Sequence, residues 1–166
     1  MDMALRCAFT GHRAQKLPWG FDELDPRCLD LKQRIYDTAE AVYTAGFDSF
    51  LCGMAEGCDL YFCEAVLSLR SEHPEIRIEA AIPFAGQADR WPAKERDRYA
   101  RLLSQCDAVT VLQEAYSPGC MMKRNRYMVD HAELIIACYD GQTGGTLNTL
   151  RYALERGVRI VHLSIE

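Results

Sequence analysis

Short apolar runs alternate with longer amphipathic segments along the chain. The runs that have the length of a buried strand cover residues 5–9, 49–52, 76–82, 108–112, 134–138 and 158–163. Between them, apolar residues recur every three or four positions, which is the spacing of one face of a helix. Such faces are formed by Leu31, Ile35, Ala39 and Val42, by Leu60, Cys63 and Leu67, and by Leu147, Leu150 and Leu154. The pattern predicts alternating strands and helices.

This alternation predicts an α/β fold. Strands that are apolar on both faces and are joined by helices indicate a mostly parallel sheet, because parallel strands need crossover connections that cover both faces. We therefore expect an open, mostly parallel sheet with helices on both faces. No repeat, low-complexity stretch or long linker divides the chain, so residues 1–166 are predicted to form a single domain.

The loops that follow the predicted strands carry most of the unusual residues. In an open α/β sheet these loops emerge at the carboxyl edge, where ligands bind. They read TGHRAQKLPWG, GMAEGCD, PFAGQADRW, QEAYSPGCMMKRN and YDGQTGGT. The loops at the opposite edge, such as TAGFD and ERGVR, are short and plain. Glycine, aromatic and cationic residues are thus predicted to gather at one end of the sheet.

Composition and charge narrow the class of protein. The net charge of −5 and the pI near 5.4 argue against nucleic acid and anionic lipid as partners. No apolar run approaches the roughly 20 residues that span a bilayer, and no signal peptide is recognisable, so we expect a cytoplasmic protein with no membrane partner. The eight cysteines show neither a C-x-x-C pair nor zinc-finger spacing. We therefore expect free, buried thiols, with no metal and no cofactor.

The segment GQTGGT opens the last predicted helix directly after a strand. Its glycines allow a ligand to approach the backbone, and the first amides of a helix point outward beside the positive end of the helix dipole. Gly144, Gly145 and Thr146 are thus candidates to bind a phosphate or a carboxylate. The alternative is a tight turn in which Thr146 is an ordinary N-cap.

The segment GMAEGCD is a second glycine-containing loop, between the second predicted strand and the next helix. It contributes Gly53, Met54, Gly57 and Asp59 as candidate ligand-binding residues. It is not a Walker A loop, because no Gly-Lys-Ser/Thr follows. A carboxylate would repel phosphate, so Asp59 would accept a hydrogen bond from a sugar hydroxyl or from the backbone. The alternative is that Asp59 caps the next helix or lies in its first turn.

Two further segments supply cations. Arg124 lies near the start of a predicted helix, where its charge opposes the helix dipole, so an anionic ligand would compensate. The alternative is a solvated charged face. The tetrapeptide TGHR follows the first strand and would form another wall of an anion pocket; its residues are Thr10, Gly11, His12 and Arg13.

Two tryptophans, Trp19 and Trp91, lie in loops of the same edge. Each could stack on a base or close over it as a lid. The alternative is that both indoles hold long loops in place by packing.

Five segments in the same order over residues 5 to 163 identify a resemblance: FTGHR, GMAEGCD, IPFAGQADRW, YSPGCMMKRNRYMVD and YDGQTGGTLNT. They resemble the YpsA-like family of the SLOG superfamily, which also contains the Lonely Guy phosphoribohydrolases and the DNA-processing A proteins. The resemblance implies a Rossmann-like domain that binds a nucleotide or a nucleotide derivative.

The enzymes of this superfamily carry the elements R-K-x-x-M and P-G-G-x-G-T-x-x-E. Arg124 and Met128 match the first element, but Asn125 replaces its lysine. In the second element Thr149 replaces the glutamate, and the proline is absent. Threonine cannot act as a general base or stabilise an oxocarbenium ion as a carboxylate does, so hydrolysis by the same mechanism is not expected.

Three functions follow as hypotheses. The first is a module that binds a phosphorylated nucleoside such as an ADP-ribose-like or NAD-derived molecule and that could act as a sensor. The second is a nucleoside-monophosphate N-glycosidase with a relocated carboxylate, for which Glu56, Asp59 and Glu114 are candidates; no catalytic residue is assigned. The third is single-stranded DNA binding, which the acidic charge disfavours. The resemblance also suggests a homodimer.

Overall fold

The computed structural model describes residues 5–166, which form a six-stranded sheet with the strand order β4-β3-β2-β1-β5-β6. All five strand pairs are parallel. The strands are β1 (Leu5–Gly11), β2 (Phe47–Cys52), β3 (Arg77–Ile82), β4 (Ala108–Val111), β5 (Leu134–Tyr139) and β6 (Arg159–Ser164). The helices are η1 (Ala14–Lys16), α1 (Pro26–Thr44), α2 (Cys58–Glu72), α3 (Ala93–Leu103), α4 (Cys120–Asp130) and α5 (Gly145–Glu155).

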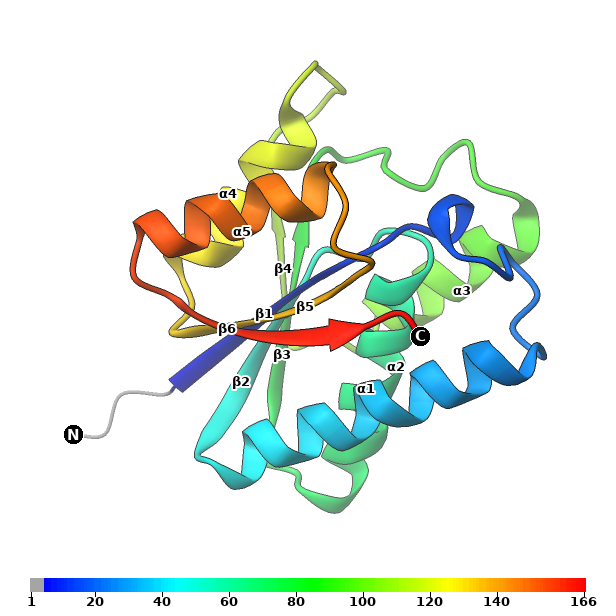
Figure 1. Cartoon of the computed structure of the whole chain (residues 1–166). Helices are drawn as coiled ribbons and strands as arrows, with labels where there is room; N and C mark the ends of the chain where they lie inside the picture. Colours follow the sequence, from blue (N-terminus) through cyan, green and yellow to red (C-terminus); the bar gives the residue numbers. More distant parts are fainter. Residues whose placement is uncertain (1–4) are drawn as a thin grey trace.

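Helices cover both faces of the sheet (Figure 1). α1, α2 and α3 lie on one face, and α4 and α5 lie on the other. The chain runs outward from β1 to β4 and then returns to place β5 on the other side of β1. This reversal is the topological switch point, where open α/β sheets bind ligands. The prediction of an open, Rossmann-like parallel sheet is confirmed.

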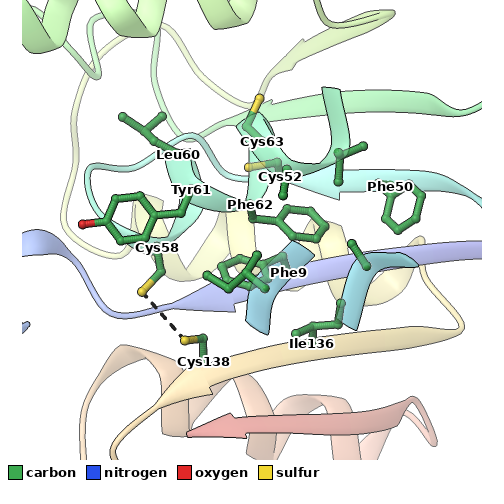
Figure 2. Packing of buried hydrophobic residues seen from close by; sticks show 14 of the residues in the cluster. Phe9, Phe50, Cys52, Cys58, Leu60, Tyr61, Phe62, Cys63, Ile136 and Cys138 are labelled. Carbon is green, nitrogen blue, oxygen red and sulfur yellow. Dashed lines mark hydrogen bonds between the residues drawn. The ribbon is translucent and has the colours of Figure 1, made fainter. Parts of the chain in front are cut away.

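The core on the α1–α2 side is aromatic and rich in thiols. The rings of Phe9 and Phe62 stack with their centroids 4.4 Å apart, and Phe50 meets Phe62 edge-on, as Figure 2 shows. The eight cysteines are free thiols and all but Cys106 are buried. The Sγ atoms of Cys58 and Cys138 lie 3.9 Å apart. These residues fix the ends of β1, β5 and α2 against one another, beside the switch point.

Two expectations about burial are wrong. Leu154 is 69% exposed, because the face of α5 that meets the sheet is formed by Thr146, Thr149, Leu150 and Ala153, three of which have small side chains. The edge strand β4 is not buried on both faces, since Val109 and Val111 are exposed. Small side chains let α5 approach the sheet closely, and an edge strand has a neighbour on one side alone.

No apolar face was assigned between Pro92 and Ser104, where the predicted alternation requires a helix, and α3 fills this segment. α3 is highly charged and buries little besides Tyr99 and Leu102, so its apolar stripe is too narrow to stand out. Among residues 5–166, the helices are all too short or too polar to cross a membrane.

Candidate functional site

A hollow of about 260 Å³ opens at the switch point, over the carboxyl ends of β1 and β5. We call it the switch-point hollow. Among its lining residues are eight of the predicted ligand-binding residues: Thr10, Gly11, His12, Arg13, Asp59, Arg124, Gly145 and Thr146. Four others support its walls without lining it: Gly53, Met54, Gly57 and Gly144. Segments that are distant in the sequence therefore converge on one concave site.

The start of α5 forms one wall of this hollow. Gly144 is the N-cap, with φ 148° and ψ −168°, and no side chain caps the helix. The alternative interpretation of Thr146 as the N-cap is therefore wrong, since Thr146 lies inside the first turn. Uncapped amides at a helix start are donors beside a positive partial charge. Gly145 and Thr146 bring this feature into the hollow.

Arg124 projects from α4 into a nearly water-free position and is 4% exposed. Its Nη1 donates to the carbonyl oxygen of Gly53 at 2.5 Å, and its Nε donates to Asn125 Oδ1 at 2.7 Å. A Cβ on Gly53 would lie 2.5 Å from Nη1, so only glycine leaves room for the guanidinium. The interpretation of Arg124 as part of a solvated charged face is wrong.

Two exposed cations, Arg13 and Lys16, line the same hollow. Among residues 5–166, neither of them nor Arg124 forms an ion pair with a carboxylate. Lys16 is not among the residues predicted from the sequence, although it lies in the loop that follows TGHR. A Cβ on Gly144 would be 2.8 Å from Lys16 Nζ, which places this ammonium group against the start of α5.

Asp59 is the carboxylate of the hollow, and it is buried. Its Oδ2 accepts a hydrogen bond from the amide of Ala55 at 3.1 Å, while the N-cap of α2 is Gly57. Asp59 therefore does not cap α2 but lies in its first turn, and it accepts a hydrogen bond from the backbone as predicted. Burial raises the pKa of Asp59, and Arg124 and the Ala55 amide oppose this effect. Burial likewise lowers the pKa of Arg124.

The loops after β1 and β2 touch each other at Gly57. Its φ is 93°, and a Cβ there would lie 2.5 Å from the amide nitrogen of Ala14. Close approach allows the amide of Cys58 to donate to the carbonyl of His12 at 3.1 Å. Met54 also has a positive φ, of 59°, and its side chain is buried in the core rather than in the hollow. The hydrogen bond between Cys58 and His12 fixes the loop that carries Arg13 and Lys16.

His12 is buried and is held by Asp140. The ring Nε2 lies 3.1 Å from Asp140 Oδ1 and 3.2 Å from the backbone amide of the same residue. A hydrogen bond from the Gln142 amide, followed by the contact with His12, lowers the pKa of Asp140. The pair connects the end of β1 to the loop before α5. Across the described residues 5–166, no three His, Cys, Asp or Glu side chains cluster in a way that could hold a metal ion.

The two tryptophans differ in environment. Trp19 is buried, and its Nε1 donates to the hydroxyl of Tyr61 at 3.3 Å, so the packing interpretation is confirmed for this residue. Trp91 is half-buried; its ring meets Tyr99 edge-on at a centroid distance of 5.2 Å, and it borders a second hollow.

Asn125 and Thr149, which stand at the lysine and glutamate positions of the two enzyme motifs, contact each other. Asn125 Nδ2 donates to Thr149 Oγ1 at 2.9 Å, and Thr149 Oγ1 donates to the carbonyl of Gly145 at 2.9 Å. Thr149 is fully buried. A neutral, satisfied pair therefore occupies the place of a lysine and a glutamate.

The parallel sheet and its switch-point hollow define the chain as a Rossmann-like α/β protein. The model of the YpsA family, described as the YspA SLOG family, matches residues 7–159. The chain belongs to this family. It is 35% identical over 142 residues to the uncharacterized SPbeta prophage-derived protein YoqJ of Bacillus subtilis, a match that covers 78% of this chain and 83% of YoqJ. It is 25% identical to the UPF0398 protein YpsA of the same bacterium, over 84% of this chain and 78% of that protein.

Two solved structures share the fold. One is the DNA processing protein A from Helicobacter pylori, described with its single-stranded DNA binding mode. It has a TM-score of 0.65 and 17% identity; the match covers 95% of this chain but 64% of the other chain. The second is the molybdenum cofactor binding protein from Rippkaea orientalis, with a TM-score of 0.60 and 15% identity over 99% of this chain and 78% of that chain.

Proposed function

We propose that the protein binds a phosphorylated nucleoside derivative in the switch-point hollow. One observation carries this proposal: Arg13, Lys16 and Arg124 meet the uncapped start of α5 without a carboxylate partner among residues 5–166. The buried Asp59 carboxylate compensates the Arg124 charge from beyond ion-pair distance. No carboxylate among residues 5–166 pairs with Arg13 or Lys16, so a bound anion would add charge compensation and stabilise the site. The whole chain has a charge of −5, so this group of three cations is opposite in sign to the net charge of the chain.

Each group has a role in this proposal. The amides of Gly145 and Thr146 and the hydroxyl of Thr146 bind phosphate, and the three cations neutralise it. Asp59 accepts a hydrogen bond from a sugar hydroxyl. Thr10, Gly11 and His12 form the floor over β1. The SLOG family membership supports a ligand at this place, and the neighbours of the same fold are described as binding DNA or a molybdenum cofactor.

Binding without cleavage is favoured over the N-glycosidase. The contact between Asn125 and Thr149 provides neither a base nor a carboxylate for a developing oxocarbenium ion. Of the carboxylates considered as replacements, Asp59 lines the hollow, whereas Glu56 and Glu114 do not. Incubation with nucleoside monophosphates and analysis for free base tests this point; released base would favour the glycosidase.

A thermal-shift screen over nucleotides, ADP-ribose, NAD and inorganic phosphate tests the proposal. A ligand at 100 times its Kd adds about 2.7 kcal/mol to the free energy of unfolding, which raises Tm by roughly 5 to 10 °C in a chain of this size. Arg13→Gln and Lys16→Gln should each weaken binding about tenfold, because each removes a charge-assisted hydrogen bond. Arg124→Ala should abolish the shift.

The matched control is Arg159→Gln. Arg159 is exposed at the opposite edge of the sheet, so its replacement changes the net charge equally but should leave the shift unchanged. If Arg13→Gln and Lys16→Gln keep the full shift, the hollow does not bind the ligand. A salt-sensitive gel shift with single-stranded DNA would instead favour nucleic acid. The homodimer and the cytoplasmic location stay predictions, which sizing chromatography and cell fractionation test.

A further inference from the structure

A second hollow lies between the loops that follow β3 and β4. It has a volume of about 680 Å³, which is in the range of small-molecule sites. Successive turns order its first loop: the amides of Gln87, Asp89 and Trp91 each donate to the carbonyl three residues earlier. The amide of Ala85 lies 3.2 Å from the carbonyls of Gln113 and Glu114, which joins the two loops. The hollow is thus preformed.

Aromatic side chains dominate this second hollow, which we call the aromatic hollow. Phe84 and Tyr116 meet edge-on with their centroids 5.5 Å apart, and Trp91 borders the same space. Tyr116 is 63% exposed on its loop. An aromatic ring left this open has an unused face on which a planar heterocycle can stack. Asp89 and Glu114 also line the hollow with a single cation, Arg90, so its net negative lining favours a neutral ring over a phosphate.

One residue from the lining of each hollow donates a hydrogen bond to the same carbonyl group. Arg124, from the switch-point hollow, and Gln87, from the aromatic hollow, both donate to the oxygen of Gly53, at 2.5 and 3.3 Å. Gln87 is 7% exposed, and its Oε1 accepts no hydrogen bond within residues 5–166. The side-chain amide of Gln87, which lies between the two hollows, therefore has an unused acceptor oxygen.

The volume of the switch-point hollow and the distance between the two hollows set the minimum length of a ligand that reaches both. The switch-point hollow, at about 260 Å³, is smaller than most small-molecule sites, so part of a nucleotide would lie outside it. The midpoint of the β1–β5 pair and that of the β3–β4 pair are three strand spacings apart in the sheet, or roughly 14 Å. A ligand that reaches both hollows must carry more than one phosphate between its ring and its anionic end.

We infer that the aromatic hollow is the subsite for the ring of the ligand whose phosphate binds at the switch point. This inference rests on the proposed function and sharpens it: the ligand is a nucleoside diphosphate or a nucleoside-diphosphate sugar such as ADP-ribose, and a nucleoside monophosphate is too short. The ring stacks on Tyr116 and Trp91, and the phosphates extend past Gly53 to Arg124 and the start of α5.

Tryptophan fluorescence and calorimetry test the inference with ADP-ribose, AMP and pyrophosphate as probes. ADP-ribose should quench the emission of Trp91, and Trp91→Phe should lose this quenching because Trp19 is buried in the core. Tyr116→Ala should bind ADP-ribose about tenfold more weakly, which is the loss of one base–aromatic stack, and should bind pyrophosphate unchanged. AMP should bind no more tightly than pyrophosphate.

Phe21→Ala is the matched control, since Phe21 is 49% exposed and lines neither hollow. It should bind both probes as the parent does. If Lys16→Gln weakens ADP-ribose binding but Tyr116→Ala does not, the aromatic hollow is not the ring subsite, although the phosphate site stands. If the parent binds neither pyrophosphate nor ADP-ribose, the proposed function fails, and the inference fails with it.

Discussion

The first turns of α1 and α5 differ in whether a side chain accepts a hydrogen bond from their free backbone amides. α1 begins at Pro26, and the side chain of its N-cap Asp25 accepts a hydrogen bond from the amide of Arg27 at 2.8 Å. α5 begins after Gly144, and no side chain caps it. α1 lies away from the switch-point hollow, whereas the first residues of α5 line it.

In the proposed function, the start of α1 serves stability and the start of α5 serves binding. α2, α3 and α4 also begin without a side-chain cap, so α5 is distinguished by the place of its first residues in the hollow. A side-chain cap satisfies amides that would otherwise lack a partner, and it adds stability to the fold. The same cap at α5 would compete with an anion for those amides. In the proposed function, an anion bound at the start of α5 would provide the stabilisation that a side-chain cap gives α1.

The largest effect is expected from Gly144→Ala. The φ of 148° at this position is one that alanine rarely adopts, so the strain should lower the free energy of unfolding by about 1–3 kcal/mol. The first amides of α5 should also turn away from the hollow, and pyrophosphate binding should fall more than tenfold. Urea unfolding and calorimetry measure the two effects.

Gly157→Ala provides the control for this change. Gly157 has a φ of 72° beyond the other end of α5, and a Cβ on this residue would have no atom of another residue within 4 Å. Stability should fall by a similar amount while pyrophosphate binding is retained. Equal binding by Gly144→Ala and the parent would contradict the role given to the start of α5.

A smaller and purely structural effect is expected from Asp25→Ala. This substitution removes the cap of α1 and the ion pair with Arg27, so Tm should fall by a few degrees. The increase of Tm on ligand addition should be the same as in the parent. A reduced ligand-induced shift would show that α1 and the hollow are coupled, and the separation of roles would then be wrong.

The smallest effect concerns pH. Hydrogen bonds from the Arg27 side chain, and then from its amide, lower the pKa of Asp25 from 3.8 to about 2. Because the pKa is lowered by folding, this stabilisation is complete above pH 3.8 and is lost as the pH falls toward about 2. Asp25→Asn should flatten this part of a plot of Tm against pH. An unchanged slope would exclude Asp25 as a contributor.

The sequence predicts the sheet better than it predicts individual side chains. All six strands lie where the apolar runs place them, and the signal is strongest for the central strands, which are buried on both faces. The side chain of Leu154 was predicted to face the sheet, and this prediction was wrong. Spacing alone did not reveal that Thr149 and Ala153 are the residues facing the sheet. The apolar face of α3 was not assigned, because most of the surface of this helix is charged and faces water.

The candidate site shows the same limit. The glycine-rich loops were expected at one edge, and topology brings them together there. Lys16 was missed because only the folded loop directs its ammonium group toward Gly144, 128 positions later in the chain. The pairing of Asn125 with Thr149 also requires the packing of α4 against α5, which no local pattern reveals.

The most direct test follows individual backbone amides of the ¹⁵N-labelled protein by NMR while pyrophosphate is added. The amides of Gly145 and Thr146 should move strongly downfield and saturate together, because they donate to the anion at the start of α5. The amides of Arg27 and Cys28, at the start of α1, should not move. Stationary signals from Gly145 and Thr146, in a protein that nonetheless binds pyrophosphate, would contradict the claim that the uncapped start of α5 is the phosphate site.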